Sequence, residues 1–140
     1  RYKVAQYYTD KLKEFDPTEK YFQTPLEVGD GGHVYHQYTL IIKDNHGNGA
    51  SRNCKFVSVR DELKNYLSEH GIPSMVYYPL PLQEQEAFKD IAVPAEKLDV
   101  AKRLSLSVLS LPMHTELKEE VQDFIIEKIK EFFIKSQYDV

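Results

Sequence analysis

The sequence is short of features that define several protein classes. It has one cysteine, Cys54, so it cannot form an internal disulfide framework, and a lone thiol fits a reducing cytoplasm. It has no apolar run long enough to span a bilayer and no signal-peptide pattern. Its 18 basic and 22 acidic residues are interspersed without a basic stripe, which argues against binding nucleic acid through phosphate neutralisation. We therefore expect a cytoplasmic protein that binds neither membrane nor nucleic acid.

Catalytic and ligand-binding motifs are also missing. There is no Gly-x-Ser-x-Gly elbow, no Walker loop and no dinucleotide fingerprint. The five histidines and one cysteine lack metal-ligand spacing, so no metal site is expected. The run Gly29-Asp30-Gly31-Gly32 is interpreted as a turn, because no helix-forming sequence follows it to hold an anion.

What is present is an ordinary globular composition. With 41% hydrophobic and 29% charged residues, 140 residues are enough for one domain with a core and too few for two. The chain begins at Arg1, without methionine, and enters helical sequence at once. We therefore expect residues 1–140 to be a single domain cut from a longer chain.

The stretch from Ile72 to Gln83 is the most distinctive part of the chain. Met75 and Val76 are expected to add bulk to the core, and Pro79 and Pro81 must end the strand because they restrict the backbone and donate no N–H. Tyr77 and Tyr78 therefore lie at a rigid exit from a strand. Two interpretations stay open: both rings fill the core, or both are presented to a ligand.

Periodicity predicts the remaining elements. Helices are expected over 2–15, 58–71, 83–89, 100–107 and from 115 onward; strands are expected over 33–42, 54–59, 72–78 and 108–111. Ser58, Asp99 and Thr115 are the expected helix caps, and Gly71 ends the second helix. The polar stretch 43–53 is expected to be a hairpin-like loop. Together these elements predict an α/β (α+β) two-layer sandwich: a small, mostly antiparallel sheet with helices on one face.

Side-chain patterns predict which faces are buried. The last helix should bury an apolar stripe made of Leu117, Val121, Phe124, Ile125, Ile129, Phe132 and Phe133. The helix at 100–107 should bury Ala101 and Leu104. Within strand 33–42, His36 shares a face with Val34, Tyr38, Leu40 and Ile42, which favours a buried structural histidine over a ligand-contacting one. His114 is interpreted as structural rather than functional.

Four segments together carry a family resemblance. They are His33-Val-Tyr-His-Gln-Tyr; Arg60-Asp-Glu-Leu through His70-Gly-Ile-Pro-Ser-Met-Val-Tyr-Tyr-Pro-Leu-Pro-Leu-Gln; Val100-Ala-Lys-Arg-Leu-Ser-Leu-Ser-Val-Leu-Ser-Leu-Pro-Met-His114; and the terminal helix. Their order and spacing resemble the C-terminal part of the DegT/StrS family of nucleotide-sugar aminotransferases. The resemblance covers nearly the whole chain.

The resemblance implies a specific function for the whole protein. Such enzymes depend on pyridoxal phosphate (PLP) and move an amino group from glutamate to a keto group on a nucleotide-linked sugar, in cell-surface polysaccharide or amino-sugar biosynthesis. The small domain packs on a larger PLP-binding domain, and active sites form at a homodimer interface. The Schiff-base lysine belongs to that larger domain, so no residue of this chain is assigned a catalytic role and the fragment alone is expected to be inactive.

The chain departs from the family at Tyr77. Many relatives carry His-Tyr-Pro where this chain has Tyr77-Tyr78-Pro79. A tyrosine can hydrogen-bond a sugar or phosphate oxygen, but it is not a cation near neutral pH. Tyr77, Tyr78 and His36 are the candidate substrate-binding residues. The alternative function is a free-standing α/β module that binds or senses a small molecule without catalysis.

Overall fold

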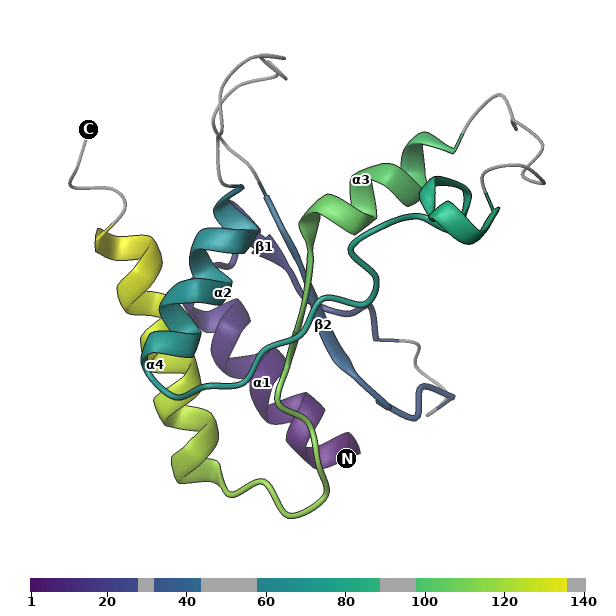
Figure 1. The fold of residues 1–140 in the computed structure, drawn as a ribbon. Helices are drawn as coiled ribbons and strands as arrows, with labels where there is room; N and C mark the ends of the chain where they lie inside the picture. Colours follow the sequence, from purple (N-terminus) through teal and green to yellow (C-terminus); the bar gives the residue numbers. More distant parts are fainter. Residues whose placement is uncertain (28–31, 44–57, 89–97, 136–140) are drawn as a thin grey trace.

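The chain folds into two layers, a small sheet and a set of helices (Figure 1). The computed structural model describes residues 1–27, 32–43, 58–88 and 98–135. The elements are α1 (Tyr2–Phe15), β1 (Phe22–Gln23), β2 (Tyr38–Ile42), α2 (Val59–Glu69), two 3-10 turns η1 (Leu82–Glu84) and η2 (Glu86–Phe88), α3 (Asp99–Ser107), β3 (Val108–Leu111) and α4 (Glu119–Lys135). The strands lie in the order β1-β2-β3, and both pairings are antiparallel. The predicted fold class is confirmed.

The pairing of β2 with β3 decides which side chains meet the helices. Tyr38 pairs with Leu111 and Leu40 with Leu109, and these four side chains are buried. Paired residues point to the same side of a sheet, so this face meets the helices. Between them, Thr39 pairs with Ser110 on the opposite face, where the two hydroxyl oxygens lie 2.8 Å apart.

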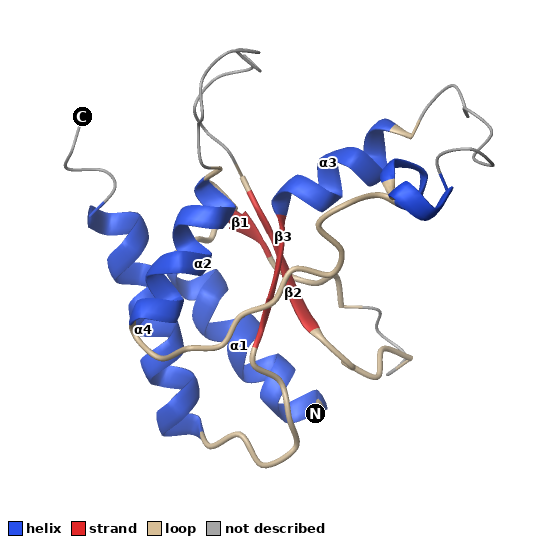
Figure 2. Cartoon of the chain, in the orientation of Figure 1, coloured by secondary structure: helices blue, strands red, loops and turns tan. Residues whose placement is uncertain are grey.

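Helices α1, α2 and α4, hereafter the helical layer, cover one face of the sheet (Figure 2). The Tyr8 ring of α1 lies 5.0 Å from the Tyr38 ring of β2, and its hydroxyl donates to the carbonyl of Pro112. The Tyr38 and Thr9 hydroxyl oxygens are 2.8 Å apart. Burial raises the pKa of both tyrosines, so they remain neutral.

Asp16 ends α1, as the Asp16-Pro17 pair predicts, and it also organises the next turn. Its buried carboxylate accepts hydrogen bonds from the backbone N–H groups of Lys20, Tyr21 and Phe22. These bonds lead the chain into β1, a strand that the sequence pattern does not predict. With two residues, β1 is too short to show the period-two alternation of a strand.

Both predicted ends of α2 are confirmed. The Ser58 side chain accepts from the backbone N–H of Asp61 at 3.2 Å. Gly71 follows the last helical turn with φ of +73°, a left-handed conformation that suits glycine.

The last helix is buried along a slightly different face from the predicted one. Leu117, Ile125, Ile129, Phe132 and Phe133 are buried as predicted, but Val121 and Phe124 are exposed. Gln122 is buried instead, because its side-chain amide donates to the carbonyl of Val4 in α1 at 2.9 Å. The prediction that Thr115 caps this helix is wrong, since α4 begins at Glu119.

The predicted strand 33–42 is correct only in its second half. The chain is irregular before Tyr38, and Tyr35 has φ of +45°, which breaks the alternation of faces. Tyr35 is therefore buried, whereas Val34 and His36 are exposed, which is the reverse of the prediction.

The predicted strand 72–78 is reduced to one bridge. Met75 exchanges two backbone hydrogen bonds with Ser110 of β3, at 3.0 and 2.8 Å. Pro73 and Pro79 flank this short segment and donate no N–H, so a longer ladder cannot form. Ile72 is buried and Val76 packs partly against the core, but Met75 is 51% exposed, so its predicted place in the core is wrong.

The other strand and loop predictions fall largely outside the described residues. Residues 54–57 of the predicted strand 54–59 are not described, and Val59 already belongs to α2. The predicted turn at 29–32 and the predicted loop 43–53 also lie mostly outside the described part of the chain.

Helix α3 projects away from the helical layer, next to η1 and η2 (Figure 1). It begins at Asp99, and its N-cap is Leu98, so Asp99 is not the cap. Ala101 is exposed and Leu104 is only partly buried, which contradicts the prediction that both are buried. The predicted helix over 83–89 is instead the two 3-10 turns, as far as it is described.

Two kinds of feature were not found in the described ranges. None of the helices there combines the length and apolar character needed to cross a membrane. The same residues contain no group of three or more side chains suited to holding a metal ion.

Candidate functional site

A cleft of about 480 Å³ opens between two segments that are far apart in the sequence. One wall comes from the segment that leaves the Met75 bridge and is lined by Tyr77, Tyr78, Leu80, Pro81, Leu82 and Gln85. The other wall comes from α3 and the start of β3 and is lined by Ala101, Leu104, Ser105 and Val108. Residues 77–88 and 98–107 are called the cleft unit below.

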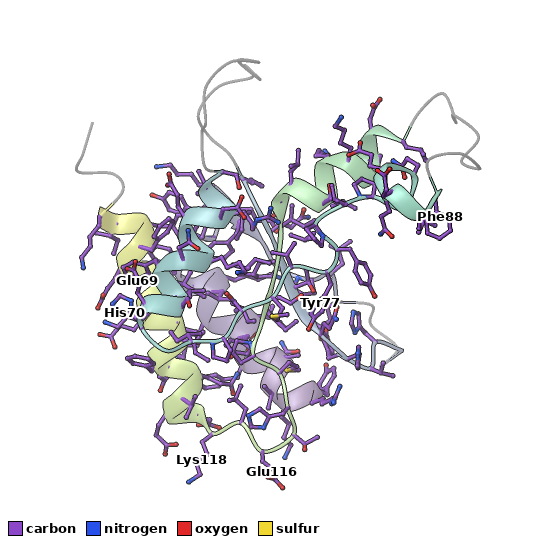
Figure 3. The ribbon with its side chains drawn as sticks, viewed as in Figure 1. Glu69, His70, Tyr77, Phe88, Glu116 and Lys118 are labelled. Atoms are coloured by element: carbon purple, nitrogen blue, oxygen red, sulfur yellow. The ribbon has the colours of Figure 1, made fainter. Side chains whose placement is uncertain are left out.

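Tyr77 and Tyr78 lie at the start of the first wall, where the chain leaves the Met75–Ser110 bridge. Figure 3 labels Tyr77 on this segment and Phe88 at the far end of the cleft unit. The Tyr77 and Tyr78 ring centroids are 6.1 Å apart with an interplanar angle of 75°, an edge-to-face arrangement. Tyr77 is 40% exposed and Tyr78 is 73% exposed. Neither ring fills the core, so the first of the two open interpretations is wrong.

The first wall of the cleft is held by short-range hydrogen bonds and one ion pair. The backbone N–H of Glu84 donates to the carbonyl of Pro81 at 3.0 Å, which closes η1. Across the cleft unit, the Lys102 ammonium lies 3.5 Å from the Glu84 carboxylate. Both side chains are well exposed, so this pair adds little stability.

The second wall is held by a buried arginine. Arg60 in α2 is 6% exposed, and one guanidinium nitrogen donates to the carbonyls of Ser105 and Val108, at 3.1 and 3.2 Å. Its Nε donates to the Asp61 carboxylate at 2.7 Å. These carbonyls lie at the C-terminal end of α3, where a positive charge is favourable. Arg60 therefore fixes the cleft wall to the helical layer.

The predicted site residues do not all come together. Tyr77 and Tyr78 both line the cleft, but His36 does not. His36 is exposed on the irregular segment before β2, where its carbonyl accepts from the Arg1 guanidinium at 3.2 Å. The prediction that His36 is buried is wrong because the strand starts only at Tyr38. His114 is exposed too, and it does not line the cleft.

The sequence did not indicate that Gln85 and Ser105 line the cleft or that Arg60 holds its second wall. Polar side chains in predicted helices are usually solvated, so their pattern did not predict these positions. The periodicity that predicted burial of Leu104 was a usable clue, since it marked the face of α3 that turns toward the first wall.

The groups that line the cleft are suited to binding a ligand. Its described lining residues include no lysine, arginine, histidine, aspartate, glutamate or cysteine. The polar groups available are two phenols, the Gln85 amide and the Ser105 hydroxyl, which donates to the carbonyl of Lys102 at 2.8 Å. The cleft therefore combines apolar walls with a few uncharged polar groups.

Known proteins with similar sequences and structures are longer than this chain. A pleiotropic regulatory protein of Geobacillus stearothermophilus is 41% identical over 95% of the chain, which spans 31% of that protein. A UDP-N-acetyl-3-dehydro-alpha-D-glucosamine 3-aminotransferase of Acidithiobacillus ferrooxidans is 32% identical over 86% of the chain, which spans 27% of that enzyme. The chain thus spans about a third or less of these relatives.

A solved structure and a family model agree with these relatives. The crystal structure of a DegT DnrJ EryC1 StrS aminotransferase from Brucella abortus matches 93% of this chain and 29% of its own, with a TM-score of 0.72 and 32% identity. The resemblance derived from the four sequence segments is confirmed. Residues 1–130 match the model of the DegT/DnrJ/EryC1/StrS aminotransferase family, and the chain belongs to that family.

Proposed function

We propose that this chain is the C-terminal domain of a PLP-dependent aminotransferase. The whole protein would move an amino group from glutamate to the keto group of a nucleotide-linked sugar, in the synthesis of cell-surface polysaccharides or other amino sugars. The observation that carries the proposal is the family match over residues 1–130. A relative named as a UDP-sugar 3-aminotransferase supports the substrate class.

The lining residues of the cleft do not fit PLP. A Schiff base needs a lysine amine, and a phosphate ester needs cations or free backbone N–H groups. The lining residues include no cationic side chain, and Pro79 and Pro81 remove two N–H groups from this segment. We therefore assign the cofactor to a larger domain of the same polypeptide, and we propose that this domain and a second subunit complete the active site. A cytoplasmic location is part of the same proposal.

The part of the reaction that we assign to this domain is substrate binding. Tyr77 and Tyr78 present exposed rings and hydroxyls at a cleft with apolar walls, and such clefts bury small ligands. The proposed role of His36 is separate, because its exposed ring would have to reach the substrate from outside the cleft.

The test uses the complete protein as its gene encodes it. On adding glutamate, we expect the PLP absorbance to convert to that of the amine form, and a keto-sugar nucleotide should restore the original spectrum. Tyr77→Ala should lower kcat/KM for the sugar nucleotide about tenfold, a typical effect of losing one positioned binding group. Tyr2→Ala, at a tyrosine that is 51% exposed and outside the cleft lining, is the matched control and should retain wild-type turnover. Wild-type turnover in Tyr77→Ala would remove Tyr77 from the site.

The name of one relative favours a second candidate function. The protein that is 41% identical is called a pleiotropic regulatory protein, a name that refers to regulation and not to amino transfer. Reading the coding sequence upstream of Arg1 separates the two candidates. A large domain with a lysine-bearing PLP segment supports the aminotransferase, whereas a start codon next to Arg1 supports the module.

A further inference from the structure

The cleft is poorly suited to the charged middle of a nucleotide-linked sugar. A diphosphate requires positive charge, and the described residues that line the cleft include no cation. Lys102 pairs with Glu84. Arg60 lies behind the second wall, where its guanidinium donates to Ser105, Val108 and Asp61. The described lining of the cleft therefore favours an uncharged part of the substrate over the diphosphate.

The groups that line the cleft suit a flat, uncharged ring. Tyr78 leaves 73% of its surface exposed, and its ring meets that of Tyr77 edge to face. Leu80 and Leu82 stand beside the rings, and Leu104 faces them from α3. Aromatic side chains of this kind bind nucleobases by stacking.

The cleft also contains a side chain that can recognise the edge of a base. The Gln85 amide is partly buried and makes no hydrogen bond with the described residues. A primary amide offers a donor and an acceptor side by side, which match the acceptor and donor on the imide edge of uracil or thymine. The Ser105 hydroxyl keeps its lone pairs, because it donates its own hydrogen to Lys102.

We infer that this cleft binds the nucleobase of the sugar nucleotide, with Tyr78 stacking on a pyrimidine and Gln85 pairing with its imide edge. The inference rests on the proposed function. A base bound in the cleft would fix the orientation of the substrate, with the diphosphate leading out of the cleft toward the cofactor in the rest of the protein. The volume of about 480 Å³ lies within the range of small-molecule sites.

Binding to the complete protein by calorimetry tests the inference, with uridine 5′-monophosphate, thymidine 5′-monophosphate and glucose 1-phosphate as probes. Tyr78→Leu should weaken the binding of either nucleotide about tenfold or more, the size of one stacking contact. It should change glucose 1-phosphate binding less than about twofold, because that probe has no base. Gln85→Leu should weaken both nucleotides and reduce their preference over cytidine 5′-monophosphate, which lacks the imide N–H.

The controls separate this inference from the proposed function. Tyr2→Leu removes an exposed tyrosine outside the cleft lining and should leave all affinities unchanged. If glutamate converts the PLP spectrum but Tyr78→Leu and Gln85→Leu bind the nucleotides as wild type does, the inference is overturned and the proposed function stands. The same holds if Tyr78→Leu lowers the Tm without changing nucleotide affinity, because the cleft is then filled by protein. Absence of the spectral change counts against the proposed function itself.

Discussion

The helical layer and the cleft unit differ in how much of their apolar surface this chain covers. Helix α4 buries Ile125, Ile126, Ile129, Phe132 and Phe133 against the sheet and the other helices. Helix α3, by contrast, buries only Ser105. In the cleft unit Leu80, Leu82, Val100 and Leu106 are each at least half exposed.

This difference in buried apolar surface indicates how each region is stabilised. The helical layer is held by burial of apolar surface, which is cooperative and does not depend on a few bonds. The cleft unit is attached through the Met75–Ser110 bridge and the Arg60 hydrogen bonds. The exposed Lys102–Glu84 pair joins only its own two segments. Exposed apolar surface of this extent usually marks a surface that another molecule or domain covers. Substitutions in each region test this difference.

The largest effect is expected for matched leucine truncations. Leu63→Ala opens a cavity in the helical layer, where Leu63 is fully buried, and should lower the free energy of unfolding by about 2–5 kcal/mol. Leu104→Ala removes a partly buried wall of the cleft and should cost less than about 1 kcal/mol. Urea unfolding of the 140-residue chain, followed by circular dichroism, measures both. Equal losses would show that the cleft unit is as well packed as the helical layer.

Removing Arg60 should separate the two regions at an intermediate cost. In Arg60→Met the carbonyls of Ser105 and Val108 lose their donor, which costs about 1–3 kcal/mol. Hydrogen exchange should accelerate in α3 more than in α4. Arg60→Lys keeps the charge but not the planar donor group, so it should restore only part of the loss. Unchanged exchange in α3 would mean that Arg60 does not hold it.

Glu131 should contribute to the stability of the helical layer above about pH 4.5. Hydrogen bonds from Lys128 and Tyr66 hold the pKa of Glu131 below its usual value of 4.5. Because the folded pKa is lower than the unfolded one, this contribution is present above about pH 4.5 and is lost as the pH falls below it. Glu131→Gln should therefore show a smaller drop in Tm than the wild type between pH 6 and pH 3.

The control for this titration is Glu116→Gln, at an exposed acid outside α4 (Figure 3). Its Tm should follow the wild-type pH dependence. If Glu131→Gln follows that curve as well, the link between α2 and α4 through Tyr66 and Glu131 does not contribute to acid stability.

The smallest effect is expected at the rim of the cleft. Lys102→Met and Glu84→Gln, alone and together, should each change the free energy of unfolding by less than about 1 kcal/mol, because both partners are solvated. A double-mutant cycle at low and high salt measures the coupling energy. A coupling above about 2 kcal/mol would show that the cleft unit is held more firmly at its rim than its exposure suggests.

The predictions that succeeded rested on local chemistry. Tyr2–Phe15, the Ser58 cap and the Gly71 end of α2 follow from periodicity and from the backbone preferences of single residues. The strand Val108–Leu111 was also predicted with its correct bounds, because Pro112 ends an apolar run. The wrong predictions concern burial and have different causes. His36 is exposed because Tyr35 adopts a left-handed conformation and β2 starts only at Tyr38. The buried face of α4 is rotated because Gln122 donates to Val4 in α1, a partner distant in the sequence.

The fold class, the family resemblance and the position of Tyr77 and Tyr78 next to the prolines could be predicted from the sequence, because element order, spacing and proline positions are properties of the chain alone. Only the tertiary structure decided that the tyrosines face a cleft, that Gln85 and Ser105 join them, and that the buried Arg60 holds the opposite wall. The cleft could not be predicted because its two walls come from separate parts of the chain. Its second wall comes from α3, and no local pattern near residues 77–85 indicates which element will lie opposite.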